Sequence, residues 1–179
     1  MRFTYRVGRW QYWNHRHICD LFINRARAQH VSPQHLGRVV RGIYRVALNA
    51  SFRRGGALFV LLRNRNSLRK MVVLGDAIGD SGREKVHEAF DQTLSGQLIH
   101  NMPLVLATEL SSLDGGVVFD NRGRLLAYGA VLKTSRSFNS SEGSRTKAAI
   151  SASHFGIAVK VSSDGDIGLW EEGKPFLEL

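Results

Sequence analysis

This chain of 179 residues has one cysteine, three prolines and no long hydrophobic run. A single thiol, Cys19, cannot form an internal disulfide, so a disulfide-stapled secreted domain is excluded and a reducing compartment is expected. No stretch approaches the roughly 20 apolar residues that a membrane-spanning helix needs. The basic amino end has no apolar segment behind it, which does not fit a secretory signal. The composition therefore predicts a soluble, cytoplasmic protein without a membrane span.

Acidic residues are scarce in the first 70 positions, where Asp20 is the one acid beside 15 Lys and Arg, a net charge of +14. Residues 71–179 hold 10 Lys and Arg and 14 acids, a net charge of −4. A basic block can bind phosphate-rich partners, anionic lipid heads or an acidic protein surface, or it can be a solvated helix face. Trp10 and Tyr12 stand among these cations, as nucleic-acid contact would require. No nucleic-acid-binding motif accompanies them, so such a partner is not expected.

Hydrophobic periodicity divides the chain into alternating helices and strands. Helical spacing is seen at 16–30, 34–52, 80–96, 102–113 and 144–154. Short apolar runs predict strands at 57–62, 71–74, 117–119, 125–132, 157–161 and 167–170. This alternation predicts an α/β fold, with a central mixed β-sheet flanked by helices. We expect a basic, aromatic-rich arm and helix at 1–34, in which residues 1–14 form an irregular arm or a short strand, and a domain at 35–179.

Three arginines recur at helical spacing beside the apolar stripe of 34–52. They are Arg38, Arg41 and Arg45, three and four residues apart. Residues at this spacing lie on one side of a helix. The spacing predicts a solvent-facing or partner-facing row rather than a ligand site.

Asp114-Gly115-Gly116 joins the end of a predicted helix to a buried strand. Two glycines at this place allow positive φ and leave the backbone uncovered, so that a flat ligand can approach closely. An acid beside them can orient a hydroxyl group or hold a divalent ion. A tight turn with a solvent-exposed Asp114 is the alternative that these residues leave open.

A second feature lies at the start of the last predicted helix. After a glycine, Ser144, Arg145, Thr146 and Lys147 place two hydroxyls and two cations on its first turn. Free backbone N–H groups at a helix start favour an anion, and basic side chains there oppose the helix dipole unless an anion is present. The pattern indicates a phosphate cradle, although the glycine spacing of a Walker-type loop is absent. The Ser-rich loop 133–143 can fold over a ligand, and an ordinary solvated helix start is the alternative.

The order of these features resembles the diadenylate cyclase (DAC) domain family. Members of that family have an Asp-Gly-Ala between a helix and a strand. After a hairpin, a Gly-Thr-Arg-His-Arg-Ala-Ala opens a short helix, and a strand pair with a serine in its turn follows. The corresponding stretches here are LDGGVVFDNRGRLLAYGAVL, GSRTKAA and IAVKVSSDGDI, and GGALFVLL resembles the family's first core strand. The resemblance covers about residues 35–170.

The resemblance implies a DAC-like α/β sandwich in which two domains face each other, each with one ATP. It implies that Asp114, with Mg²⁺ or Mn²⁺, helps to deprotonate a ribose 3′-hydroxyl for attack on the α-phosphate of the partner's ATP. It also implies that the basic motif grips phosphates through Arg145 and Lys147. The residues expected at the nucleotide are Asp114, Gly115, Gly116, Gly143, Ser144, Arg145, Thr146 and Lys147.

The chain departs from the family pattern chiefly at the phosphate grip. Thr146 stands where the family has His, and Lys147 where it has a second Arg. Lysine keeps the charge but lacks the planar fork that binds phosphate in a bidentate way. Gly116 replaces Ala, and Leu113 and Ser163 stand where some members have a metal-binding His and a Glu. Other members also lack that His and Glu, so these two differences do not exclude activity.

The altered grip favours binding over synthesis, because catalysis needs charge stabilisation focused on the transition state. We therefore expect a divergent, sensor-like DAC domain that binds ATP or a cyclic dinucleotide and needs no cofactor. A homodimer or larger oligomer, and an output domain or partner protein, are expected with it. One alternative is an active diadenylate cyclase that condenses two ATP to cyclic di-AMP with Mg²⁺ or Mn²⁺. The other is binding of nucleic acid or an anionic surface through the first 70 residues.

Overall fold

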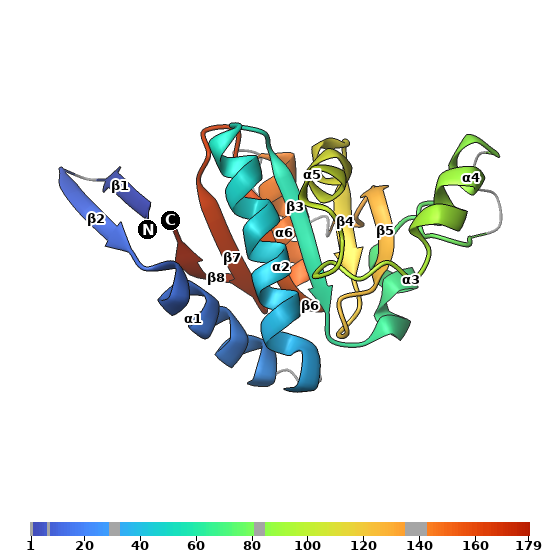
Figure 1. Ribbon diagram of the computed structural model, residues 1–179, viewed down its shortest axis with the longest axis horizontal. Coiled ribbons are helices and arrows are strands. Elements are labelled where there is room, and N and C mark those ends of the chain that lie inside the picture. Colours follow the sequence, from blue (N-terminus) through green and yellow to red (C-terminus); the bar gives the residue numbers. More distant parts are fainter. Residues whose placement is uncertain (1, 7, 29–32, 81–84, 135–142) are drawn as a thin grey trace.

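The structure, a computed structural model, describes residues 2–6, 8–28, 33–80, 85–134 and 143–179. Its centre is a six-stranded sheet with the order β5-β4-β3-β6-β7-β8 (Figure 1). β3 and β4 run parallel and the other neighbours antiparallel, so the predicted α/β fold with a mixed sheet is confirmed. The six strands are β3 (Ala57–Leu62), β4 (Gly116–Phe119), β5 (Leu125–Ala130), β6 (Gly156–Val161), β7 (Ile167–Glu171) and β8 (Lys174–Glu178).

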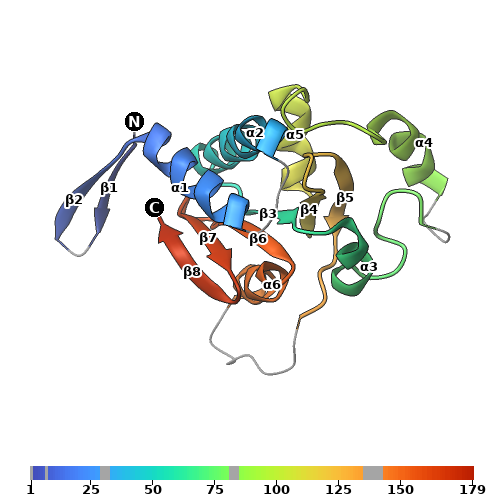
Figure 2. The same ribbon diagram turned by 90° about the horizontal axis from the view of Figure 1, so that it is seen from below.

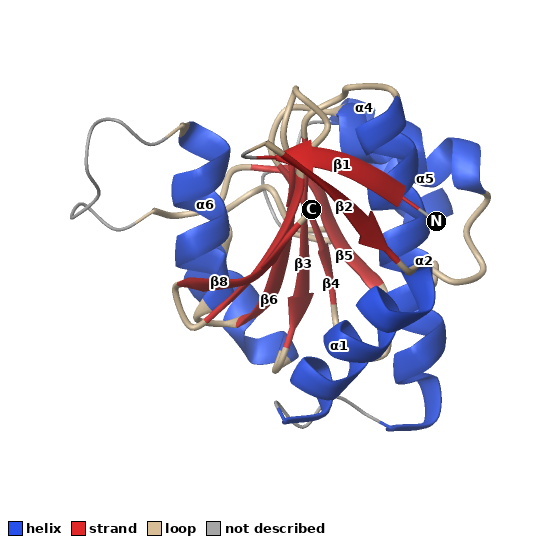
Figure 3. Ribbon diagram, turned by 90° about the vertical axis from the view of Figure 1, so that its left-hand side faces the viewer, coloured by secondary structure: helices blue, strands red, loops and turns tan. Residues whose placement is uncertain are grey.

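Helices cover both faces of this sheet. In Figure 3 the sheet is seen nearly edge-on, with α6 on one side and α1, α2 and α5 on the other. None of the helices in the described ranges has the length and apolar character needed to cross a membrane. The helices are α1 (His15–Ala28), α2 (Pro33–Phe52), α3 (Leu68–Met71), α4 (Lys85–Leu94), α5 (Leu104–Ser112) and α6 (Ser144–Ser153), with a short 3₁₀ helix at Arg65–Ser67.

Strand β3 lies at the centre and explains why the sheet needs two helical layers. All six of its residues are buried, as its continuous apolar run predicts. Alternate side chains point to opposite faces: Phe59 and Leu61 pack in the cluster that includes α1, α2 and α5. Leu58 and Val60 pack in the cluster that includes α6. Leu58 is the second residue of the strand, and it becomes the floor of the cavity described below.

The turn between β4 and β5 is held by one buried carboxylate. Asp120 is 5% exposed, and its Oδ1 accepts backbone N–H bonds from Arg122 (2.9 Å) and Arg124 (2.8 Å). The turn reverses the chain through Gly123, whose φ is +81°. Hydrogen bonds to a charged acceptor are among the stronger ones in proteins. This turn therefore fixes the pairing of the two strands that carry half of the candidate site.

The amino-terminal residues form a hairpin, not a single short strand or an irregular arm. β1 (Arg2–Arg6) pairs with β2 (Arg9–Trp13) around Gly8, whose φ of +74° suits a tight turn. Figures 1 and 2 show this hairpin projecting from the rest of the chain. Trp10 is 74% exposed, whereas α1 buries its apolar side in the same core as α2. The boundary between 1–34 and 35–179 stays a prediction.

The predicted strand at 71–74 is wrong. Helix α3 ends at Met71, and a single bridge pairs Val72 with Leu132. Leu74 is 78% exposed, and the chain turns at Gly75 with φ +94°. Four apolar residues in a row indicate burial, but only Met71 and Val72 are buried here. The stretch is therefore too short to form a buried strand.

Sequence periodicity also missed an edge strand. β8 pairs antiparallel with β7 at the edge of the sheet. Its run contains Pro175, which cannot donate a backbone hydrogen bond and usually argues against a strand. At an edge that restriction is tolerated, and Leu177 still contributes a buried side chain.

Candidate functional site

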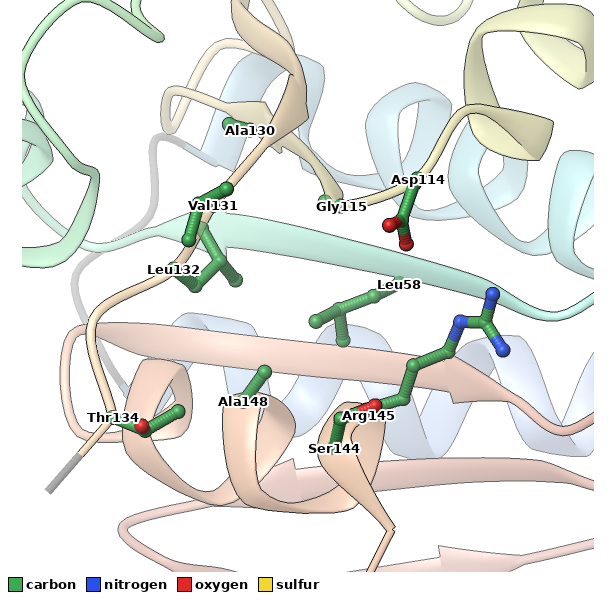
Figure 4. Close-up of a pocket in the computed structure, with 11 residues that line it drawn as sticks. Leu58, Asp114, Gly115, Ala130, Val131, Leu132, Thr134, Ser144, Arg145 and Ala148 are labelled. Carbon is green, nitrogen blue, oxygen red and sulfur yellow. The ribbon is translucent and has the colours of Figure 1, made fainter. Parts of the chain in front are cut away.

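A cavity of about 270 Å³ opens between the amino ends of β3 and β4 and the first turn of α6 (Figure 4). It brings together the two features that the sequence singled out, although strands β4 and β5 and the 133–143 loop separate them in the chain. Ligands of doubly wound sheets bind at the carboxyl ends of the strands, so this position is a different one. The lining consists of Leu58, Asp114, Gly115, Gly116, Ala130, Val131, Leu132, Thr134, Ser144, Arg145 and Ala148.

Gly115 positions the acidic side of the cavity. Its φ is +110°, and a Cβ there would lie 2.5 Å from the carbonyl carbon of Gly129. Only glycine therefore fits where the start of β4 meets the end of β5. Helix α5 ends in the extended residue Leu113, and the chain then passes through Asp114 into this turn. Figure 4 shows the Asp114 carboxylate directed towards the side of the cavity on which Arg145 lies.

The Asp114 carboxylate is exposed and forms no hydrogen bond or ion pair with the described residues. Such a carboxylate can accept a hydrogen bond from a hydroxyl group, or contact a cation, without first breaking a hydrogen bond within the protein. The arrangement thus agrees with the idea of an acid that faces a ligand, and also with a solvated turn.

The first turn of α6 forms the opposite wall. Gly143 is the N-cap and supplies no side-chain cap, while its carbonyl accepts bonds from the N–H groups of Thr146 (3.0 Å) and Lys147 (3.1 Å). The N–H groups of Ser144 and Arg145 make no bond with the described part of the chain. Such orphan donors, at the positive end of the helix dipole, favour an anion.

Arg145 crosses from α6 towards β3 and lies against the backbone of Gly56. A Cβ added at Gly56 would collide with the Arg145 guanidinium. In the sequence Gly56 is part of the GGALFVLL stretch, and the structure adds that its missing side chain leaves room for this cation. The signal was present in the sequence, but only three-dimensional packing connects Gly56 with Arg145.

Three of the predicted nucleotide residues do not line the cavity. Gly143 and Lys147 are absent from the lining, and Thr146 accepts a hydrogen bond from Lys160 Nζ (3.0 Å) on β6. Lys160 also lies 5.3 Å above the ring centroid of Trp170. Most of the loop 133–143 falls outside the described residues. The roles assigned to these residues stay predictions.

The described lining contains one carboxylate, Asp114, and one cationic side chain, Arg145. No group of three or more His, Cys, Asp or Glu suited to a metal ion occurs among the described residues. Mg²⁺ usually takes one or two carboxylates and draws its remaining ligands from water and substrate phosphates. Asp114 could supply the one carboxylate that such a magnesium ion needs, but the described lining offers no second carboxylate.

Cys19 does not belong to this site. It is buried in the cluster formed with α2, on the other face of the sheet from α6. Burial raises the pKa of its thiol, and the nearby Arg41 opposes that shift only in part. Because the thiolate is the nucleophile, a thiol held protonated is inert.

Comparison with known proteins shows likeness in structure alone. No protein-family model and no curated protein matches the chain. A hypothetical membrane spanning protein from Bacillus cereus is 19% identical with a TM-score of 0.57, over 90% of this chain and 74% of that one. A double mutant of DacA from Staphylococcus aureus is 20% identical with a TM-score of 0.47, over 76% and 83%. The chain therefore shares its fold with the Bacillus cereus protein, and at this identity the likeness shows the fold only.

Gly115 in the cavity lining and Gly143 at the N-cap of α6 differ in what a side chain would meet, which gives a matched test of the geometry at Gly115. Gly115→Ala should lower the free energy of unfolding by about 2 kcal/mol or more, because positive φ and a backbone collision act together. Gly143→Ala should cost less than about 1 kcal/mol, since nothing lies within 4 Å of the added Cβ. Urea unfolding of both variants measures this, and equal losses would contradict the close approach at Gly115.

Proposed function

We propose that the cavity beside Gly115 binds a nucleotide, and that the chain is a divergent DAC-like sensor of ATP or a cyclic dinucleotide. The observation that carries this proposal is the meeting of the two sequence features, Asp114-Gly115-Gly116 and Ser144-Arg145, around one cavity. Each feature alone is compatible with an ordinary turn or helix start. Their convergence from separate segments favours a common ligand.

The lining supplies a partner for each part of a nucleotide. Leu58, Leu132 and Ala148 give an apolar surface for a base. Asp114 can accept a hydrogen bond from a ribose hydroxyl. The orphan N–H groups at the start of α6, with the Arg145 guanidinium, suit a phosphate.

Recognition is favoured over synthesis by the number of cations at the cavity. Arg145 is the one cationic side chain in the described lining, whereas Thr146 is bonded to Lys160 and Lys147 lies outside the lining. Phosphoryl and nucleotidyl transfer develop charge that several fixed donors must stabilise. A single guanidinium with two backbone donors is sufficient for binding. A homodimer and an output partner belong to this proposal as further expectations.

A second candidate, an active diadenylate cyclase, is favoured by the carboxylate of Asp114 in the lining, which has no partner among the described residues. A metal ion held by Asp114 and the phosphates of ATP would supply charge neutralisation. The chain's own contribution would be to orient the ribose hydroxyl at Asp114 and to hold phosphate at α6.

Binding should depend on Arg145 and be nearly independent of its neighbour Lys147. Arg145→Ala should weaken the binding of ATP or cyclic di-AMP about tenfold or more, because one charge-assisted contact is lost. Lys147→Ala removes the same charge from the same helix, but outside the lining, and should change affinity less than about threefold. Titration calorimetry of both variants makes the comparison.

A second pair of variants controls for the position of the guanidinium. Gly56→Ala must displace Arg145 and should weaken binding, whereas at Gly55 the nearest atom to an added Cβ is 3.8 Å away, so Gly55→Ala should not. If neither ATP, linear dinucleotides nor cyclic dinucleotides bind the wild-type protein, or if Lys147→Ala matters as much as Arg145→Ala, the proposed site is wrong.

Incubation with ATP and Mg²⁺ or Mn²⁺, followed by chromatography of the products, separates the two candidates. The sensor proposal predicts no cyclic dinucleotide above the background given by the Asp114→Asn variant. Product that forms with the wild-type protein and disappears with Asp114→Asn would replace the sensor with the cyclase.

A further inference from the structure

A second cavity, of about 380 Å³, lies on α2 and the segment just before α5. Figure 3 places α2 on the face of the sheet opposite to α6, and the two cavities share no lining residue. The sequence suggests a solvent-facing or partner-facing arginine row at this place. The structure adds that the row forms one wall of a concave site. Its lining consists of Arg38, Arg41, Gly42, Arg45, His100 and Asn101.

This concave shape depends on a glycine inside a helix. A Cβ added at Gly42 would lie 3.3 Å from backbone atoms of His100, so the missing side chain lets the His100 segment approach α2. Arg45 Nη2 then donates to the carbonyl oxygen of Met102 (3.1 Å) and fastens that segment. Glycine is among the least favourable residues in a helix interior. The cavity is thus a built feature of the fold.

The positive charge of this cavity is not balanced within the described chain. Arg38 and Arg41 form no hydrogen bond or ion pair with the described residues, and no acidic side chain lines the cavity. Arg41 folds back over Gly37, where an added Cβ would lie 3.1 Å from its Nη2. Asp20, the one acid in the first 70 residues, makes no ion pair with the described residues. Like charges on one helix side repel each other, so an anion here would be stabilising.

His100 adds a polar side chain to the lining of this cavity. Its Nδ1 is the one buried side-chain nitrogen or oxygen, among the described residues, that has no hydrogen-bond partner. Buried polar groups are nearly always paired. The pKa of His100 is lowered chiefly by burial, and further by the charges of Arg38 and His35. The rings of His35 and His100 are stacked, with centroids 6.3 Å apart. An anion beside His100 would oppose the lowering of its pKa by Arg38 and His35.

We propose that this cavity binds an oligophosphate group, two or three linked phosphates of a small molecule. Guanidinium groups present a planar fork that matches phosphate oxygens. The row from Arg38 to Arg45 is about 10 Å long at 1.5 Å per residue, which suits a short phosphate chain. A single carboxylate would neutralise one of the three arginines only.

The lining favours this ligand over a nucleic acid. Its one ring is the imidazole of His100, which already stacks on His35, and it contains no aliphatic, phenyl or indole side chain on which a base could rest. Single-stranded nucleic acids are held along several nucleotides by stacking aromatics beside cations. The exposed aromatic side chains Trp10 and Tyr12 belong to β2 and are not in this lining.

Calorimetry with inorganic pyrophosphate, without divalent metal, tests the proposal. The double variant Arg38→Gln/Arg41→Gln should lose about 100-fold or more in affinity, because two charge-assisted contacts disappear. The control Arg16→Gln/Arg27→Gln removes the same charge from exposed positions of α1 and should change affinity less than about threefold. In the wild-type protein, pyrophosphate should also shift the NMR signals of the His100 ring, a readout that needs no variant.

Further titrations identify the molecule that carries the oligophosphate group, and they separate the cavity on α2 from the cavity at α6. Arg145→Ala should leave pyrophosphate binding unchanged, whatever becomes of the proposed nucleotide site. If the Arg145→Ala variant binds ADP more tightly than pyrophosphate, the oligophosphate group belongs to a nucleotide. If it binds pyrophosphate more tightly than ADP, the ligand is the free ion. The proposal is wrong if pyrophosphate does not bind, or if the α1 control loses as much affinity for pyrophosphate as the Arg38→Gln/Arg41→Gln variant. It is also wrong if a short single-stranded RNA binds and pyrophosphate does not.

Discussion

The close contact of two backbones, at Gly115 and Gly129, is the constraint on which the candidate site depends. No side chain fits between the start of β4 and the end of β5, where an added Cβ at Gly115 would lie 2.5 Å from the next strand. This contact sets the direction of the chain after α5 and holds Asp114 at the edge of the cavity. The Asp120 turn closes the other end of the same strand pair, whose register shifts at two points between Gly116 and Phe119. On the basic side, Gly56 leaves room for the Arg145 guanidinium, a contact with a side chain rather than with backbone.

The two cavities lie on opposite faces of the sheet, and the one on α2 accounts for part of the uneven charge. The basic excess of the first 70 residues is partly concentrated on α2, where three arginines line one cavity. The cavity at α6 has one cation, one acid and a large apolar part. The ligand proposed for the first is an oligophosphate group, and the ligand proposed for the second is a nucleotide. The exposed aromatic hairpin β1–β2 belongs to neither cavity.

Much of the fold was predictable because the core strands are distinctive. The unbroken apolar run of β3 indicated a strand buried on both faces, and the helical stripe of α2 was equally clear. The run at 71–74 misled because apolar character indicates burial rather than extension, and Leu74 proved to be exposed. β8 was missed because Pro175 weakens a strand signal everywhere except at an edge. Single-sequence periodicity does not show which strand becomes the edge.

The site was predictable in its residue types and only partly in its geometry. Sequence patterns indicated Asp114-Gly115-Gly116 and the start of α6, because glycine next to acid or cation is chemically informative. They could not show that Thr146 contacts Lys160, since that depends on which side of α6 packs on β6. Nor could they show that Gly56 makes room for Arg145, or that Gly42 admits the His100 segment to α2. These contacts join residues that are distant in the chain.

The most direct test of the central claim is a titration of the ¹⁵N-labelled protein with ATP and, separately, with cyclic di-AMP, followed by amide NMR. If the cavity beside Gly115 is a nucleotide site, at least one of the two ligands shifts the amide signals of Gly115, Ser144 and Arg145 together. If both ligands leave these three signals in place at saturating concentration, the account of the site is contradicted.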